Sequence, residues 1–365
     1  MRPVLKPALS RAWRDSETLQ FGTVHRDARV VEQAGPAFCS FLGLLDGGRE
    51  RPELLDAGER LGLGRETTGE LLDSLEKAGL LDDEAATREA LARYPQPHRD
   101  LLGPDLASLS LVHPEPGAAP AVLSARAAAR VEVRGAGRVG TAVAAVLAAG
   151  GVGAVTVVDG GRVTPGDCSP AGLPPTEVGR LRATAARTAV QRATGRGPAA
   201  PQRRAPAGAH AAPPSLVVLA PRDGSGAFAG GAVGARRLMR AGVPHLYVGV
   251  LEHLGVVGPL VLPGASACGG CLALTRSDED AAWPRLLAQL ADDGPGRPRT
   301  PACDSALATA VAGLAALHVQ LYLDGTRPPS MDGWCEVSAV DGLARRLRLT
   351  GHPDCGCLWQ PAALR

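Results

Sequence analysis

The chain has 365 residues, more than one typical domain of roughly 100 to 200 residues, so we expect two folded units. Its 39 Lys and Arg against 37 Asp and Glu leave the charge nearly balanced, which gives no electrostatic case for nucleic acid or an anionic membrane as a partner. The start of the chain has no apolar signal region, and no run of 18 apolar residues follows. We therefore expect a cytoplasmic protein.

Residues 1–85 predict a small winged-helix-like α+β domain. Residues 17–24 and 28–33 are rich in strand-forming residues and predict a hairpin, and three helices are expected at 36–45, 51–61 and 65–78. Winged helices often bind DNA. Residues 1–95, however, carry 13 basic and 17 acidic side chains, a net charge of 13 − 17 = −4. DNA binding is therefore a minor alternative, because a DNA-reading helix needs the opposite sign.

The following segment, residues 86–127, is rich in Pro, Ala and Leu and predicts a linker with one strand at 107–112. From residue 128 to 365 we expect an α/β domain, because predicted strands and helices alternate, which is typical of a parallel sheet with helices on both faces. Two stretches rich in Gly and Pro, 195–214 and 276–302, predict loops. The expected elements are strands at 130–134, 153–158, 215–220, 244–250 and 255–262, and helices at 138–150, 176–194, 230–241 and 305–323.

A G-x-G-x-x-G motif lies between the first of these strands and the helix that follows it. Gly135 allows a tight turn, Gly137 lets the backbone approach a phosphate, and Gly140 lets helix and strand pack closely. Asp159 ends the next strand, 159 − 140 = 19 residues on, where a carboxylate can accept hydrogen bonds from a ribose. These residues do not distinguish NAD from ATP, and the alternative is a turn without any nucleotide.

Two close cysteine pairs predict a zinc site. Cys268 and Cys271 form a C-x-x-C pair, and Cys355 and Cys357 form a C-x-C pair near the C-terminus. A reducing compartment disfavours disulfides, and four thiolates suit a closed tetrahedral structural zinc. The alternative is four free buried cysteines.

The glycine motif, the sequence Val-Val-Asp-Gly-Gly-Arg-Val at 157–163, the C-x-x-C pair, a long helix and the second cysteine pair together resemble the ThiF and ubiquitin-activating-enzyme-like family, over residues 128–358. The resemblance implies a Rossmann-like domain that adenylates a carboxylate with ATP and Mg²⁺ and forms a homodimer. Gly135, Gly137, Gly140 and Asp159 would then contact the nucleotide.

Three departures from that family pattern predict that the adenylation activity is lost. The segment 165–172 lacks the Asn and Arg of active members, and Arg182 stands in place of the phosphate-contacting lysine. The strand ending near residue 219 is followed by Ala220, Pro221 and Arg222, with Asp223 displaced from the position of the metal-binding Asp.

The first alternative is an active adenylyltransferase of a peptide or carrier-protein C-terminus, with Cys303 or Cys168 as acceptor thiol. A second, a nicotinamide-dependent oxidoreductase, lacks a catalytic His or Tyr–Lys pair.

The order of the two domains resembles the degenerate ThiF-like, leader-peptide-binding partner proteins of azoline-forming, YcaO-dependent RiPP biosynthesis. The resemblance implies a PqqD-type N-terminal domain that binds a ribosomal precursor peptide as an added strand. The leader would lie beside residues 28–33 and the helix at 65–78, with Arg29, Val31 and Leu72 as candidate contacts. The alternative is that these residues only close the small core. The ThiF-like half would dimerise and dock a YcaO-type cyclodehydratase.

Overall fold

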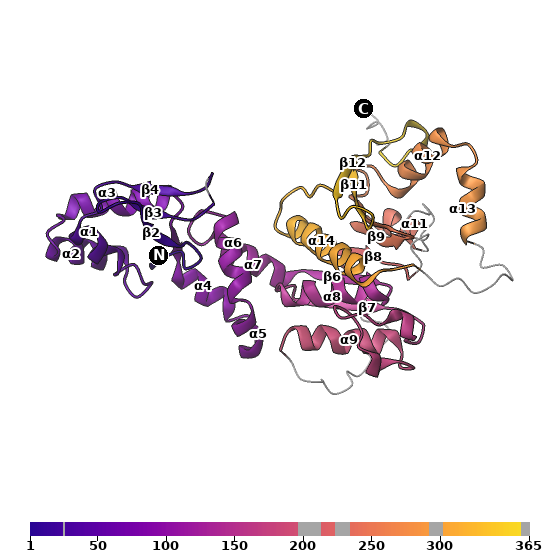
Figure 1. The fold of residues 1–365 in the computed structure, drawn as a ribbon, viewed down its shortest axis with the longest axis horizontal. Coiled ribbons are helices and arrows are strands. Elements are labelled where there is room, and N and C mark those ends of the chain that lie inside the picture. Colours follow the sequence, from indigo (N-terminus) through magenta and orange to yellow (C-terminus); the bar gives the residue numbers. More distant parts are fainter. Residues whose placement is uncertain (25, 196–212, 223–233, 292–301, 359–365) are drawn as a thin grey trace, which may run out of the picture. The chain divides into compact units, whose positions relative to one another are not determined.

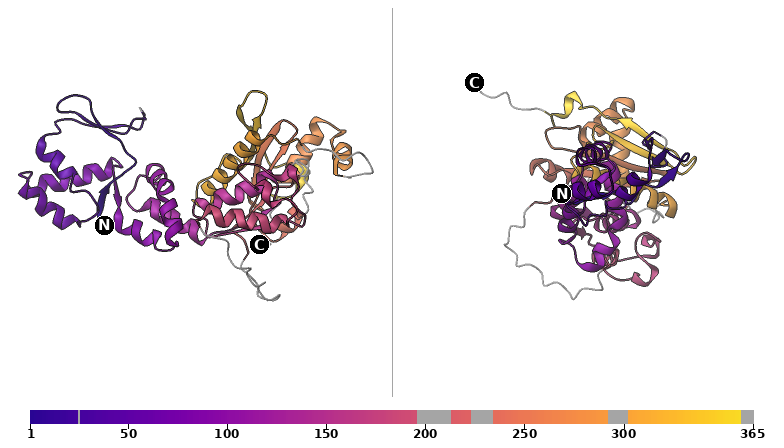
Figure 2. Two further views of the ribbon diagram at one scale, coloured as in Figure 1. Left: turned by 60° about the horizontal axis from the view of Figure 1, so that its bottom comes forward. Right: turned by 90° about the vertical axis from the view of Figure 1, so that its left-hand side faces the viewer.

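The computed structural model describes residues 1–24, 26–195, 213–222, 234–291 and 302–358. The chain divides into two compact units, Met1–Ala125 and Arg126–Arg365 (Figure 1, Figure 2). The functional residues predicted from the glycine and cysteine motifs all lie in the second unit. The predicted peptide contacts lie in the first.

Two small antiparallel sheets belong to the first unit. The three-stranded sheet has the order β2 (Arg11–Trp13), β3 (Leu19–Phe21) and β4 (Arg29–Val31). The predicted hairpin is thus present as β3 and β4, with shorter strands, and β2 was not predicted. A second sheet pairs β1 (Pro3–Leu5) with β5 (Leu81–Asp83).

Three helices follow the hairpin where the sequence predicts them: α1 (Pro36–Leu42), α2 (Arg51–Arg60) and α3 (Arg65–Lys77). Prolines in the first turn begin α1 and α2, and α2 adds a reciprocal capping box between Glu50 and Glu53. The apolar faces of the helices and strands meet in one core, whose fully buried large side chains include Phe21, Phe41, Leu54, Leu72 and Leu81.

The segment predicted as a linker is mostly helical. It contains α4 (Glu84–Leu91), α5 (Gln96–Leu101), α6 (Gly103–Val112) and the start of α7 (Ala118–Ala128). The strand predicted at 107–112 is wrong, because these residues continue α6, which begins with Pro104 and Asp105 in its first turn. Alternating Ser and Leu at 108–111 imitate the period of a strand. The first compact unit includes these helices as far as Ala125.

The second unit is built on a seven-stranded sheet of order β12-β11-β10-β9-β8-β6-β7. The strands β6 (Arg130–Arg134), β7 (Ala154–Val158), β8 (Leu216–Leu219) and β9 (His245–Leu251) are parallel, as predicted. The prediction of a wholly parallel sheet is wrong for the other half. There β10 (Leu254–Val261) pairs antiparallel with β9, β11 (Gly333–Ser338) with β10, and β12 (Ala344–Arg348) with β11. The strands β11 and β12 were not predicted.

Helices cover both faces of this sheet, as the sequence predicts (Figure 1). The side chains of β8 show why: Leu216 and Val218 join the core under α8 (Arg138–Ala149) and α14 (Ser305–Leu323), whereas Val217 and Leu219 join the opposite core. The opposite face carries α11 (Ala235–Arg240) and α12 (Gly269–Glu279). The helix α9 (Arg182–Ala193) packs on α8 and begins later than predicted.

The loop predicted at 276–302 is wrong for its first part, where α12 continues to Glu279 and α13 (Trp283–Ala291) follows. Most of the other predicted loop, 196–212, lies outside the described residues. The helix α14 is long and apolar enough to cross a membrane by length and composition, although no run of 18 apolar residues was predicted. Eight of its residues are buried, and it packs against α8, β9 and β10. We therefore interpret α14 as a core helix of the second unit.

Candidate functional site: a glycine-loop pocket and a four-cysteine cluster

Two of the three motif glycines are required by backbone packing. Gly135 has φ +107°, and a Cβ atom there would lie 1.9 Å from the carbonyl oxygen of Ala220. A Cβ atom at Gly140 would lie 2.1 Å from the carbonyl oxygen of Gly135. These contacts let α8 start directly against the ends of β6 and β8. The tight turn and close helix–strand packing predicted from the motif are thus present.

Gly137 is the N-cap of α8 and is covered by a side chain of the protein itself. A Cβ atom at Gly137 would lie 3.6 Å from Cγ of Arg222, which follows β8. The first backbone N–H groups of a helix lack intrahelical partners and favour anions. The place where the motif predicts a phosphate is therefore bordered by the Arg222 side chain.

Asp159 lies at the end of β7 with both carboxylate oxygens engaged. Oδ2 accepts a hydrogen bond from the backbone N–H of Ala136 (2.9 Å), and Oδ1 accepts from the backbone N–H of Gly161 (2.7 Å) and from Nε of Arg182 (2.9 Å). The side chains of Asp159 and Arg182 are only 7% and 14% exposed. The structure thus brings together these two predicted site residues, but they bind each other.

A second buried carboxylate, Asp167, forms the centre of the same region, and the sequence analysis did not identify it as a site residue. Its Oδ1 accepts from Nε of Arg222 (2.6 Å), and its Oδ2 accepts from the backbone N–H and the hydroxyl of Thr164 (2.8 and 2.7 Å). Burial raises the pKa of Asp167, but the hydrogen bonds from Thr164 and Arg222 outweigh burial and lower the pKa overall. The sequence feature that could have identified Asp167 is its place in the segment 165–172, where the family pattern has Asn and Arg.

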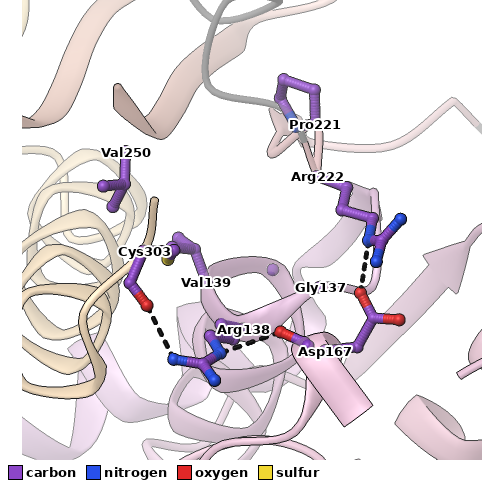
Figure 3. Close-up of a pocket in the computed structure, with 10 residues that line it drawn as sticks. Gly137, Arg138, Val139, Asp167, Pro221, Arg222, Val250 and Cys303 are labelled. Atoms are coloured by element: carbon purple, nitrogen blue, oxygen red, sulfur yellow. Dashed lines mark hydrogen bonds and ion pairs between the residues drawn. The ribbon is translucent and has the colours of Figure 1, made fainter. Parts of the chain in front are cut away.

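Arg138, the first residue of α8, lies on the other side of the pocket (Figure 3). It donates from Nε to the carbonyl oxygen of Gly166 (2.9 Å) and from a terminal nitrogen to the carbonyl oxygen of Cys303 (2.7 Å). Among the described residues, no carboxylate lies within ion-pair distance of it. Burial raises the pKa of the Cys303 thiol, which disfavours a thiolate nucleophile.

The pocket between these groups has a volume of about 140 Å³ and is lined by Gly137, Arg138, Val139, Gly140, Gly166, Asp167, Pro221, Arg222, Val250 and Cys303. Pockets for drug-sized ligands usually measure roughly 300 to 1,000 Å³. The carboxylates of Asp159 and Asp167 each already accept hydrogen bonds on both oxygens. As arranged here, these residues do not fit ATP together with Mg²⁺. Asp223, the displaced acidic residue, lies outside the described residues.

The four predicted zinc ligands converge. Sγ of Cys268 lies 3.5 Å from Sγ of Cys355, Sγ of Cys271 lies 3.3 Å from Sγ of Cys357, and all four sulfurs lie within 4.8 Å of one another. A tetrahedral site with Zn–S bonds of about 2.3 Å separates its sulfurs by about 3.8 Å. The cluster therefore fits a single four-coordinate metal ion.

The surroundings of the cluster also favour a cation. Cys268 caps α12 and accepts from the backbone N–H of Gly270, while Cys355 ends a short 3₁₀ turn, Pro353–Cys355, in the C-terminal segment. Burial and the neighbouring thiols raise the pKa of Cys355 to about 11 and that of Cys357 further. Four thiolates this close repel one another unless a positive ion lies between them. The cluster joins the C-terminal segment to α12.

The three predicted peptide contacts do not share one environment. Arg29 and Val31 lie on β4, an edge strand, where Arg29 is exposed and Val31 is partly buried. Leu72 is 1% exposed and lies in the core, so its side chain is not accessible in this structure. A surface contact at α3 would have to come from its exposed residues.

Comparison with known proteins adds two findings. Residues 118–195 match the ThiF family model, a segment that contains the glycine loop and Asp159. No curated protein matches the sequence.

Among solved structures, E. coli MccB with AMPCPP and SeMet MccA has a TM-score of 0.66 and 16% identity, covering 98% of this chain and 99% of that chain. E. coli MccB with ATP gives 0.65 and 16% with the same coverage. The heterocyclase TruD gives 0.59 and 16%, covering 98% of this chain but 42% of that chain. The chain thus carries a ThiF-like segment at residues 118–195 within an α/β fold that it shares with MccB and TruD.

Proposed function

We propose that this protein is a leader-peptide-binding scaffold that presents a ribosomal precursor peptide to a separate YcaO-type cyclodehydratase. The observation that carries the proposal is the outer edge of β4, which pairs with no further strand among the described residues. It is accompanied by a small glycine-loop pocket in which the Arg222 side chain lies beside Gly137 and binds Asp167. Zinc at the four cysteines would have a structural role, and the scaffold would act as a homodimer.

The hydrogen-bond pattern identifies which groups of β4 are free. The pairs Arg14–Thr18 and Ser10–Gly22 show that even-numbered residues of β3 bond to β2, so Leu19 and Phe21 bond to β4, opposite Val31 and Arg29. The N–H and C=O of Val30 therefore point away from β3, toward the open edge. The Val30 side chain is 42% exposed. A peptide strand can pair there without disturbing the existing sheet.

The likeness to TruD supports a role beside a larger enzyme. The match covers 42% of the TruD chain, so 100 − 42 = 58% of that heterocyclase has no counterpart in these 365 residues. We assign the missing heterocyclase chemistry to a partner protein. The likeness to MccB, whose structures include complexes with MccA, supports a peptide as the bound molecule.

The test is binding of synthetic leader peptides, measured by fluorescence anisotropy and hydrogen exchange. Val30→Pro removes the outward N–H while sparing the bonds to β3, because proline is tolerated on an edge strand. It should weaken peptide binding by about tenfold or more, since each lost tenfold corresponds to about 1.4 kcal/mol. Val30→Thr keeps the N–H and is the matched control. Equal affinity of both variants, or no protection of β4 amides on binding, would contradict the proposal.

A second candidate function, adenylation of a peptide C-terminus, is favoured by the likeness to MccB over the full length of both chains. ATP–pyrophosphate exchange in the presence of peptide separates the two. We expect no exchange, because the Asp167–Arg222 pair borders Gly137. Exchange above background would establish the enzyme and end the scaffold proposal.

A further inference from the structure

The strand β12 lies at one end of the seven-stranded sheet, and among the described residues it pairs only with β11 (Figure 1). Four of its five residues are exposed. Three of the five are arginines, and none is acidic: the basic residues are Arg345, Arg346 and Arg348. The outer side of β12 is therefore a positively charged edge of the sheet.

The ladder between β11 and β12 determines which backbone groups point outward. The N–H of Ser338 donates to the carbonyl oxygen of Leu343 (3.1 Å), and the N–H of Leu349 donates to that of Asp332 (3.1 Å). Because bonded pairs alternate along an antiparallel ladder, the odd-numbered residues of β12 bond to β11. The outward N–H and C=O groups belong to Ala344, Arg346 and Arg348. In the described part of the chain, none of these three N–H groups meets an acceptor.

The three arginines differ in whether the chain itself neutralises them. Arg345 forms an ion pair with Asp341, in the turn before β12. Arg346 donates from Nε to the carbonyl oxygen of Pro329 (2.9 Å). Neither Arg346 nor Arg348 has a described carboxylate within ion-pair distance. These two side chains lie two residues apart and so on the same face of the sheet, where they leave two positive charges without counterions.

A second copy of the chain does not fit this edge. Antiparallel pairing of two β12 strands about a two-fold axis centred on Arg345 or on Arg346 would place that arginine opposite itself. Centring on Leu347 would place Arg346 opposite Arg348. Like charges directly opposite each other destabilise a sheet. The charges of this edge therefore favour an acidic strand over another β12.

We propose that the outer edge of β12 docks an extended acidic segment of a partner protein, which adds to the sheet as a further strand. The outward backbone groups of β12 would bond to it, and carboxylates two residues apart would lie opposite Arg346 and Arg348. An apolar residue beyond the paired segment would contact Val340 and Leu343, which are 79% and 55% exposed at the turn. The proposal rests on no part of the proposed function at β4.

The experiment measures fluorescence anisotropy of a labelled eight-residue peptide of alternating Glu and Thr, titrated with the full chain. We expect saturable binding that weakens as salt is added, because salt screens exposed charges. The same peptide with Lys in place of Glu should bind at least about tenfold more weakly. Equal binding of the two peptides, or no saturable binding of the Glu peptide at up to about 1 mM protein, would overturn the proposal.

Charge variants locate the site. The double variant Arg346→Gln and Arg348→Gln removes both charges that lack counterions and leaves the backbone unchanged, so binding of the Glu peptide should weaken by about fivefold or more. The matched control is the double variant Arg236→Gln and Arg237→Gln, at two exposed positions of α11, which should bind like the unaltered protein. Unchanged affinity in the β12 variant would refute the placement.

A backbone variant tests strand pairing separately from charge. Ala344→Pro removes one outward N–H and spares the bonds to β11, because proline is tolerated at the first residue of an edge strand. It should weaken binding, whereas Ala344→Thr keeps the N–H and should not. Equal affinity of the two would contradict strand pairing, and if Ala344→Pro fails to fold, the charge variant still decides. Val30→Pro, in β4, should bind the Glu peptide normally, and a loss there would place the peptide at β4 and overturn the proposal.

Discussion

The glycine-loop pocket and the four-cysteine cluster lie in the same unit and were both predicted from short motifs, but they differ in how their ligand groups are satisfied. At the pocket, the lining carboxylate of Asp167 and the neighbouring carboxylate of Asp159 are bound by arginines and backbone N–H groups of the chain. In the cluster, four sulfurs converge and face one another. The pocket completes its electrostatics with its own side chains, whereas the cluster has the geometry of a site that a cation from outside would complete.

This difference shows that the residue types at a site do not by themselves determine whether it binds a ligand. What also matters is whether the chain already supplies partners for those residues. A carboxylate with donors on both oxygens has little to gain from a metal ion, since binding would exchange one set of charged partners for another. Thiols at 3.3 to 3.5 Å gain much, because a metal removes the repulsion between thiolates. Removing a ligand should therefore have a large effect at the cluster and a small one at the pocket.

The largest expected effect is from Cys271→Ser. Cys271 is fully buried and supplies one of four sulfurs, so its loss should lower bound zinc from about one equivalent per chain to well below half, with a large loss of stability. Mass spectrometry under native conditions and thermal unfolding with and without a chelator measure both effects.

The control for this variant is Cys39→Ser, in α1 and outside the cluster, which should keep its zinc and its chelator sensitivity. Full zinc content in Cys271→Ser, or a chelator-insensitive unaltered protein, would show that the four cysteines do not hold a metal. The comparison between the cluster and the pocket would then fail on the cluster side.

The sequence predicts the four-cysteine cluster better than it predicts the glycine-loop pocket. Close cysteine pairs are typical of metal sites, so their spacing predicts that Cys268 and Cys355 meet although they are 87 residues apart. Glycine motifs predict a turn and close packing, as found at Gly135 and Gly140, but not what fills the space above the turn. That depends on Arg222 reaching Asp167 across 55 residues, a contact with no local pattern. The antiparallel strand β11 was missed for a similar reason, because it pairs with β10, which is distant in sequence; β12 forms a local hairpin with β11 and was not recognised either.

A medium effect is expected from pH, and it supplies the baseline against which the acid sensitivity of both sites must be judged. Burial lowers the pKa of His318, in α14, from 6.5 to about 4, and its Nδ1 has no hydrogen-bond partner in the part of the chain that the structure describes. The unfolded chain therefore binds a proton below pH 6.5 that the folded chain excludes until about pH 4. Stability should fall across this window by about 3 kcal/mol, at 1.36 kcal/mol per unit.

His318→Leu should remove most of this pH dependence, measured by urea unfolding between pH 7 and about pH 4.5 with zinc present. His245, whose pKa burial also lowers, would retain part of the slope. His253, which is exposed, provides the control variant His253→Gln. If His318→Leu and His253→Gln keep the same slope, the acid sensitivity arises elsewhere, and loss of metal from the cysteine cluster becomes the explanation to test.

The smallest effects expected are from alanine substitutions in the glycine loop, and they show whether the motif serves packing or a ligand. Gly140→Ala puts a methyl group 2.1 Å from a backbone oxygen, so we expect a loss of about 2 kcal/mol in urea unfolding. Gly137→Ala meets only the Arg222 side chain at 3.6 Å and should cost less than about 1 kcal/mol. Equal losses would mean that Gly137 is as tightly packed as Gly140. A smaller loss for Gly137→Ala would mean that the missing side chain at Gly137 keeps the pocket open and is not needed for folding.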